Sequence, residues 1–121
     1  MRNIPPQFGR VRPGPVLTLP LAAGTTMQPG QVYKLTFTNV ASAVQTFRAA
    51  PAPVPQFVSL KTTASVHPIF GDATVADPTN ANALLEPADS WQDFMLLPGD
   101  TSFKVKGDTA GGDLYLLLSS Q

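Results

Sequence analysis

The side chains best suited to acid–base chemistry in this 121-residue sequence are one histidine, His67, and two pairs of aspartates. A hydrolytic triad needs a histidine beside a serine nucleophile and an acid. No nucleophile-elbow pattern surrounds any serine here. Because His67 lies between Val66 and Pro68, near the start of a short apolar run, we interpret it as a structural residue.

The aspartate pairs offer two further possibilities. Asp89 and Asp93 have the residue type of a general acid and base, and they flank Trp91. Asp108 and Asp113 bracket a Gly-Gly pair, as in some acidic calcium loops, but EF-hand spacing is missing and a hairpin turn explains the segment better. One histidine and no cysteine leave few metal ligands. We therefore predict no catalytic residue, no metal and no cofactor, and classify the protein as non-enzymatic.

Three aromatic residues suggest a binding function instead. Trp91, Tyr33 and Tyr115 could form a platform on which sugar rings stack, as in a carbohydrate-binding β-sandwich module. The alternative is that rings spread over three strands belong to the core or to a subunit contact.

The elements that would position these residues are short β-strands. Apolar and polar residues alternate in runs of four to seven residues separated by Gly and Pro, a pattern typical of antiparallel sheets. The eight predicted strands are residues 16–19, 31–38, 44–48, 56–61, 66–70, 91–97, 102–106 and 113–119. This pattern predicts an all-β fold, an antiparallel β-sandwich of jelly-roll-like type.

Two segments allow sharper predictions. The last strand, residues 113–119, has Leu114, Leu116 and Leu118 on one face and Tyr115 and Leu117 on the other, so we expect it at the centre of a sheet.

The polar segment 72–90 allows at most one short helix. Asp77 would be its N-cap and Pro78 its first residue. The pair Leu84-Leu85 would face the core.

Composition indicates a subunit of a larger assembly. Charged residues make up 13% of the chain, against about 25% in typical globular proteins, and there are 13 prolines. So few charges favour a protein whose surface is largely covered by neighbours. No apolar run approaches the ~20 residues of a membrane span, so we expect no membrane partner.

Charge is unevenly distributed along the chain. Before Asp72 there are six basic residues and no acid, and from Asp72 onward there are eight acids and two lysines, so the segments carry +6 and −6. Because the basic residues are scattered singly, we expect no nucleic-acid binding. Two interpretations stay open: copies meet head to tail in a ring, as in a trimer, or the halves interleave and the charges mix.

Residues 1–15 form a predicted N-terminal arm, followed by a single domain over residues 16–121. Prolines in the arm exclude a helix or a central strand. Apolar residues in such a segment need a surface to contact, either a neighbouring subunit or the arm's own domain. The residues expected at this interface are Arg2, Ile4, Phe8, Arg10, Val11 and Arg12.

The second half of the chain resembles small structural proteins of tailed bacteriophages. The resemblance covers about residues 66–120. It rests on a strand ending in Phe70-Gly71, a loop rich in Ala, Thr, Asn, Asp and Pro that ends near Leu84-Leu85, and the turn Pro98-Gly99-Asp100. A short Phe-x-Val strand and a Gly-Asp-Leu strand before terminal serines complete it.

This resemblance implies a virion component. The expected function is that of a capsid decoration (cement) protein, which binds the outer capsid surface and stabilises contacts between capsomers. Its partners would be the major capsid protein and copies of itself. The alternative within this class is an accessory subunit of a tail or head fibre.

Overall fold

A computed structural model describes residues 15–21, 25–48 and 56–119. The predicted arm, including Arg2, Ile4, Phe8, Arg10, Val11 and Arg12, lies outside the described residues. The strands are β1 (Leu17–Thr18), β2 (Val32–Phe37), β3 (Gln45–Thr46), β4 (Gln56–Thr62), β5 (Val66–Gly71), β6 (Gln92–Leu96), β7 (Ser102–Gly107) and β8 (Gly112–Leu118).

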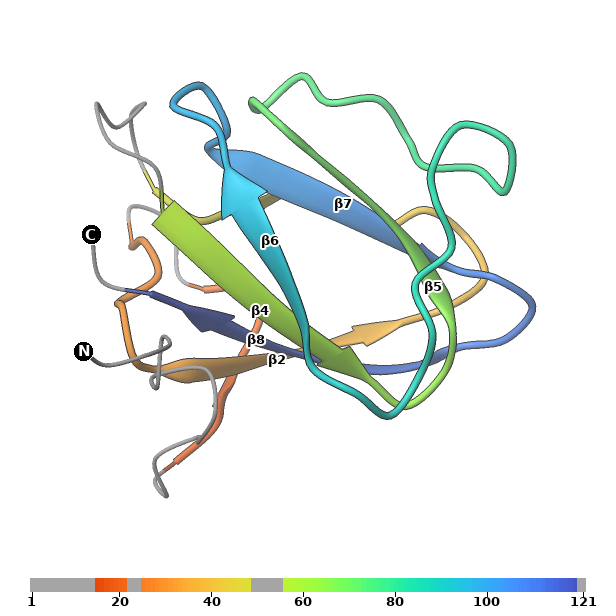
Figure 1. Cartoon of the computed structure of the whole chain (residues 1–121), viewed down its shortest axis with the longest axis horizontal. Coiled ribbons are helices and arrows are strands. Elements are labelled where there is room, and N and C mark those ends of the chain that lie inside the picture. Colours follow the sequence, from red (N-terminus) through yellow and green to blue (C-terminus); the bar gives the residue numbers. More distant parts are fainter. Residues whose placement is uncertain (1–14, 22–24, 49–55, 120–121) are drawn as a thin grey trace.

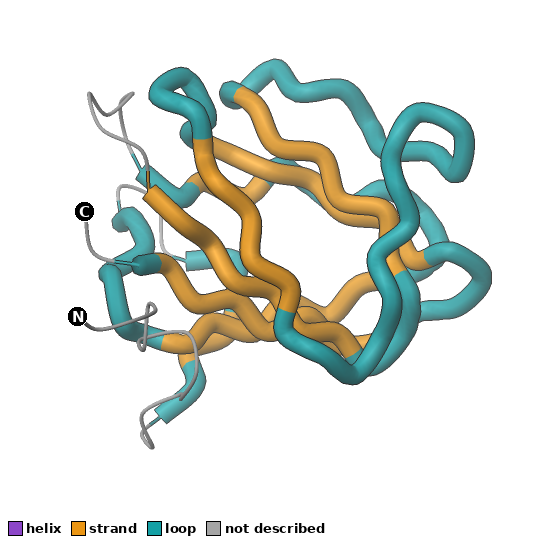
Figure 2. Tube along the Cα trace, in the orientation of Figure 1, coloured by secondary structure: helices purple, strands orange, loops and turns teal. Residues whose placement is uncertain are grey.

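The eight strands form two facing sheets, with no helix among the described residues (Figures 1 and 2). One sheet has the order β1-β2-β8-β4-β6 and the other β3-β7-β5. From β2 to β8 every strand lies in the opposite sheet from the strand before it. This winding is that of a jelly roll, so the prediction of an all-β sandwich is confirmed.

The three strands of the smaller sheet face four strands of the larger sheet, β2, β8, β4 and β6. The chain between β5 and β6, residues 72–90, forms a long loop instead of a further strand. Only Glu86 in this loop pairs with β5, through an isolated antiparallel bridge to Val66. We call residues 72–90 the 72–90 loop.

Strand β8 lies at the centre of the larger sheet, as predicted. It pairs antiparallel with β2 on one side and with β4 on the other. Leu114 and Leu116 are completely buried in the core, and Leu117 is buried on the opposite face. Burying each such leucine contributes about 1.5–3 kcal/mol to folding.

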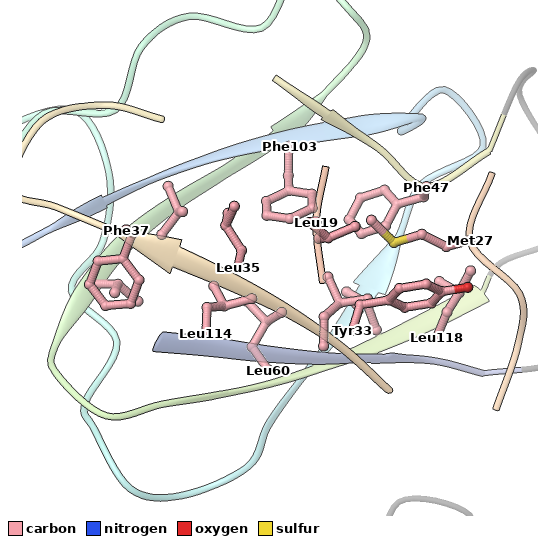
Figure 3. Packing of buried hydrophobic residues seen from close by; sticks show 14 of the residues in the cluster. Leu19, Met27, Tyr33, Leu35, Phe37, Phe47, Leu60, Phe103, Leu114 and Leu118 are labelled. Carbon is pink, nitrogen blue, oxygen red and sulfur yellow. The ribbon is translucent and has the colours of Figure 1, made fainter. Parts of the chain in front are cut away.

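Aromatic rings from both sheets fill the core at one end. Phe47 follows β3 and stacks on Phe103 of β7, with ring centroids 4.9 Å apart. Phe70 of β5 contacts Phe94 of β6 across the two sheets, at 5.5 Å. Figure 3 shows Phe47 and Phe103 on one side of this cluster and leucines of the larger sheet on the other.

The predicted helix in the 72–90 loop is wrong. Thr79 and Asn82 form a local turn: the backbone N–H of Thr79 donates to Asn82 Oδ1 at 2.7 Å, and the N–H of Asn82 donates to Thr79 Oγ1 at 3.0 Å. In the predicted helix the N–H of Asn82 would donate to the carbonyl of Pro78, so its bond to Thr79 replaces a helical hydrogen bond. Leu84 and Leu85 are exposed and do not face the core, with Leu84 82% exposed.

The turn between β7 and β8 is confirmed, but it does not close a hairpin. Strand β7 belongs to the smaller sheet and β8 to the larger one, so the turn crosses between sheets. Its backbone is tightly packed, because a Cβ atom on Gly107 would lie 2.0 Å from the carbonyl oxygen of Ala110. Only glycine fits at this position.

Candidate functional site

His67 is held between two hydrogen-bond acceptors. Its side chain is buried on β5, and its Nδ1 lies 2.9 Å from the carbonyl oxygen of Ala83. Its Nε2 lies 2.7 Å from Oδ1 of Asp108. Both ring nitrogens of His67 therefore have hydrogen-bond partners within the protein. Neither ring nitrogen is left to act on a substrate.

The His67 contacts belong to a larger set that fixes the 72–90 loop to the smaller sheet. Asn80 Nδ2 donates to Asp108 Oδ1 at 3.2 Å, and Lys106 Nζ donates to Asn80 Oδ1. Lys104 of β7 pairs with Asp77 at 2.7 Å. We call these contacts, together with those of His67, the loop latch.

The bridge between Val66 and Glu86 completes the attachment. The N–H of Glu86 donates to the carbonyl of Val66 at 2.8 Å, and the N–H of Val66 donates back at 3.1 Å. Partial burial raises the pKa of the Glu86 carboxyl. At the start of the loop, hydrogen bonds from the Thr74 hydroxyl and N–H lower the pKa of the Asp72 carboxyl. The chemistry of this region therefore serves to position a loop.

The predicted aspartate pairs have separate structural partners. Asp93 lies on β6 and accepts a hydrogen bond from the Ser59 hydroxyl at 2.5 Å, whereas the Asp89 backbone N–H donates to the carbonyl of Thr62. Both side chains are exposed.

Asp108 contacts His67, whereas Asp113 accepts from the Thr36 hydroxyl at 2.8 Å. Within the described ranges, no three His, Asp or Glu side chains gather where they could bind a metal.

The three aromatic residues do not form one platform. Tyr33 is 1% exposed and lies in the core, where its hydroxyl accepts a hydrogen bond from the Gln28 N–H at 2.7 Å. Tyr115 lies on the other face of the larger sheet, because it follows Leu114 and precedes Leu116, which both point into the core. The proposed sugar-stacking surface is therefore wrong in including Tyr33.

The charge segregation along the sequence does not produce two charged surfaces in the described part of the chain. The larger sheet alternates strands of the first half, β2 and β4, with strands of the second half, β8 and β6. Lys34 of β2 consequently lies 3.9 Å from Asp113 of β8. Of the two open interpretations, the structure supports mixing of the charges within the described residues.

The most distinctive exposed feature is apolar and lies on and beside β6. Met95 and Leu97 are 55% and 59% exposed, and Phe57, the register partner of Met95 on β4, is also exposed. We call Phe57, Asp93, Met95 and Leu97 the β6 surface. One feature of the sequence indicates this surface: the apolar Phe57 lies on the polar face of its predicted strand, together with Ser59 and Lys61.

Among the described residues, strand β6 is also an edge of the larger sheet and pairs only with β4. The β6 surface thus combines exposed apolar side chains with backbone groups that point away from the sheet, which is the kind of surface that binds another chain.

A comparison of the chain with protein families, curated proteins and solved structures finds no match. No helix in the described part of the chain is long and apolar enough to cross a membrane.

Proposed function

We propose that this chain is a non-enzymatic structural subunit of a phage particle, a decoration (cement) protein that binds the outer capsid surface and copies of itself. The observation that carries the proposal is the β6 surface, where Met95 and Leu97 are exposed at an edge of the larger sheet. His67 and Asp108 instead hold the 72–90 loop, and Asp93 and Asp113 bind hydroxyl groups on neighbouring strands. The resemblance of residues 66–120 to phage structural proteins supports the particle assignment.

The fold supports this proposal in a general way. Jelly rolls are the architecture of many viral capsid domains, although the same architecture also occurs in lectins and cupins. The burial of Tyr33 removes one of the three rings on which the lectin-like alternative depended.

A decoration protein works through the free energy of association. Each copy that contacts two capsomers adds buried surface to their junction, and separating the capsomers then requires this surface to be exposed again. A stable protein–protein interface buries on the order of 1,600 Å² in total. Exposed apolar residues such as Met95 and Leu97 provide the hydrophobic part of such an interface.

The number of copies per particle tests this function. We expect mass spectrometry of purified particles to find many copies of this chain per particle, at a constant ratio to the major capsid protein. A few copies per particle would favour the tail or head-fibre alternative. Complete absence from particles would contradict the proposal.

Rebinding provides a second test. Purified protein added to particles that lack it should bind and raise the temperature at which they release DNA. Met95→Asp should weaken this binding without unfolding the protein, whereas Thr109→Asp, an exposed change at the opposite turn, should not.

A further inference from the structure

The register of the larger sheet leaves the backbone of β6 available for another strand. Phe57 directs its backbone toward β8, because its N–H donates to Ser119 Oγ at 3.0 Å and its carbonyl accepts from the Ser119 N–H at 2.9 Å. Its register partner Met95 therefore makes no ladder hydrogen bond with β4. By the same alternation, the N–H and C=O groups of Met95 and Asp93 point outward from the sheet edge.

Acidic residues lie near this edge. Residues 86–100 contain four acids and no lysine or arginine, and the exposed Asp93 is the second residue of β6. At the other end of β6 charges of both signs meet, because the carbonyl of Leu97 accepts from Arg48 at 2.9 Å and its N–H donates to Asp100 Oδ2 at 2.9 Å. A ligand strand fits best with its basic residues near Asp93 and its apolar residues near Met95 and Leu97.

The N-terminal arm has the complementary composition. Residues 1–14 contain three arginines, no acid, and the apolar residues Ile4, Phe8 and Val11. Residues 7–12 form a proline-free run between Pro6 and Pro13. A run of this length matches an ordinary β-strand, and prolines at both ends would limit the pairing to it.

We propose that residues 7–12 of one copy add as an antiparallel strand to the open edge of β6 in a second copy. In this register Phe8 lies opposite Met95, and Arg10 lies opposite Asp93 of the second copy. Apolar then meets apolar and arginine meets carboxylate at successive positions on the same face. In the same register Arg12 lies opposite Trp91 and near Lys61 of β4. Because Lys61 has the same charge, Arg12 is not expected to contribute to binding. Adding a strand to an exposed edge is a common mode of peptide recognition.

Chain length requires that the arm come from a second copy. Pro15 is fixed beside β2, because its carbonyl accepts from Gln31 Nε2 at 2.7 Å. Residue 12 is three residues from Pro15 and reaches at most about 11 Å from it. A new strand beyond β6 lies four strand spacings from β2, about 19 Å along the sheet. The arm therefore cannot pair with β6 of its own domain.

This exchange is heterologous, since the arm of one copy binds the β6 edge of the next and leaves its own edge free for another arm. Such contacts close into a ring when the rotation between copies allows it. The inference goes beyond the phage assignment and does not depend on it, because it concerns only contacts between copies of this chain.

Disulfide trapping between single-cysteine chains tests the register. The chain has no natural cysteine, so every disulfide reports an introduced pair. Directly opposed residues of an antiparallel pair have Cα atoms about 4.5–5.5 Å apart, which suits a disulfide. A mixture of full-length Phe8→Cys and Met95→Cys chains should form a linked dimer under mild oxidation, and so should Arg10→Cys with Asp93→Cys.

A one-residue shift provides the matched control. Gln7→Cys mixed with Met95→Cys places the two thiols on opposite faces of the strands, so the linked dimer should be lost. Equal linkage of residues 7 and 8 to residue 95 would overturn the register. A full-length chain that sediments as a monomer at all concentrations would overturn the exchange itself, as would an intrachain disulfide in a diluted chain carrying both Phe8→Cys and Met95→Cys.

Charge reversal provides an independent measurement on the full chain. Arg10→Asp should weaken self-association about tenfold, and combining it with Asp93→Arg should restore most of the loss. Arg2→Asp makes the same change in net charge outside the paired run and should have little effect. Equal weakening by Arg2→Asp and Arg10→Asp, without rescue by Asp93→Arg, would show that only net charge matters and would overturn the assigned pair.

Discussion

Strands β5 and β6 each form one edge of a sheet, and the two edges are protected differently. At β5, an edge of the smaller sheet, Val66 bridges to Glu86 and the loop latch fixes the 72–90 loop alongside. Pro68 lies two residues after Val66 and so has the same orientation. Its missing N–H would point outward, and no hydrogen bond to β7 is lost. At β6, an edge of the larger sheet, Asp93 and Met95 occupy the outward positions, and the strand contains no proline.

This difference between the two edges bears on where the protein binds a partner. Natural sheets protect exposed edges with prolines, charges or covering loops, because an unprotected edge pairs with other chains. The same molecule protects β5 with a proline and a covering loop, whereas β6 has neither among the described residues and carries a single charge, Asp93. We therefore interpret the β6 edge as a binding surface.

The largest effect should come from the interior of the larger sheet. Leu116→Asp places a carboxylate in the core on β8 and should destabilise the fold by several kcal/mol, enough to prevent folding. Met95→Asp makes the same change to an exposed edge residue and should leave the melting temperature nearly unchanged. Thermal unfolding followed by circular dichroism measures both. A folded Leu116→Asp chain with an unchanged melting curve would reject the central position of β8.

Loss of the loop latch should have an intermediate effect. His67→Ala removes the side chain that links the Asp108 carboxyl group and the Ala83 carbonyl by hydrogen bonds, and should cost about 1–3 kcal/mol. Hydrogen exchange at the Glu86 amide should accelerate. Lys104→Ala removes an exposed ion pair of the same loop and should cost less than about 1 kcal/mol. Similar effects of the two changes would mean that His67 does not fasten the β5 edge.

A proline at an outward-facing position, as Pro68 is on β5, should block binding at β6 without unfolding the protein. Met95→Pro removes an outward N–H, so the fold should lose no ladder bond and only about 1 kcal/mol or less. Self-association should be lost. Gln92→Pro is the matched control, because it removes an N–H that faces β4, without deleting a core side chain, and should destabilise the sheet far more. Sedimentation velocity and thermal melts report the two properties, and undiminished association of Met95→Pro would show that the β6 edge does not bind.

The smallest effect concerns pH. Because burial raises the pKa of Glu86 in the folded state, folding favours its protonated form, and stability from this group is lost as pH rises above 4.5. Glu86→Gln should therefore gain stability relative to the natural chain as pH rises, by roughly a few tenths of a kcal/mol, since solvent screens the partly exposed carboxyl. Melting curves at pH 4 and pH 7 measure the difference. An identical difference at both values would contradict the assigned cause.

Local pattern was sufficient to locate the strands but not to arrange them. All eight predicted strands are present, because alternation and Gly or Pro punctuation are properties of neighbouring residues. The prediction of a hairpin between β7 and β8 was wrong because the sheet to which a strand belongs depends on partners far along the chain. The predicted helix was wrong because Thr79 and Asn82 bind the backbone locally, which residue type alone did not reveal.

The contacts of His67 and the β6 surface were harder to predict from the sequence than the strands. His67 and Asp108 are 41 residues apart, so no spacing rule connects them. The apolar run of 91–97 did predict a strand, but an apolar strand is usually buried, and its place at the sheet edge follows only from the topology. Phe57, an apolar residue among polar ones, was the sole local sign of an exposed surface.

Amide hydrogen exchange along β6 tests the central claim most directly. In full-length protein diluted until it is monomeric, we expect the amides of Asp93 and Met95 to exchange rapidly and that of Phe94, which faces β4, to be protected. At concentrations where the chain associates, Asp93 and Met95 should become protected while Phe94 stays unchanged. If Asp93 and Met95 are as protected as Phe94 in the monomer, or remain unprotected in the associated protein, then β6 is not an open edge that binds a second copy.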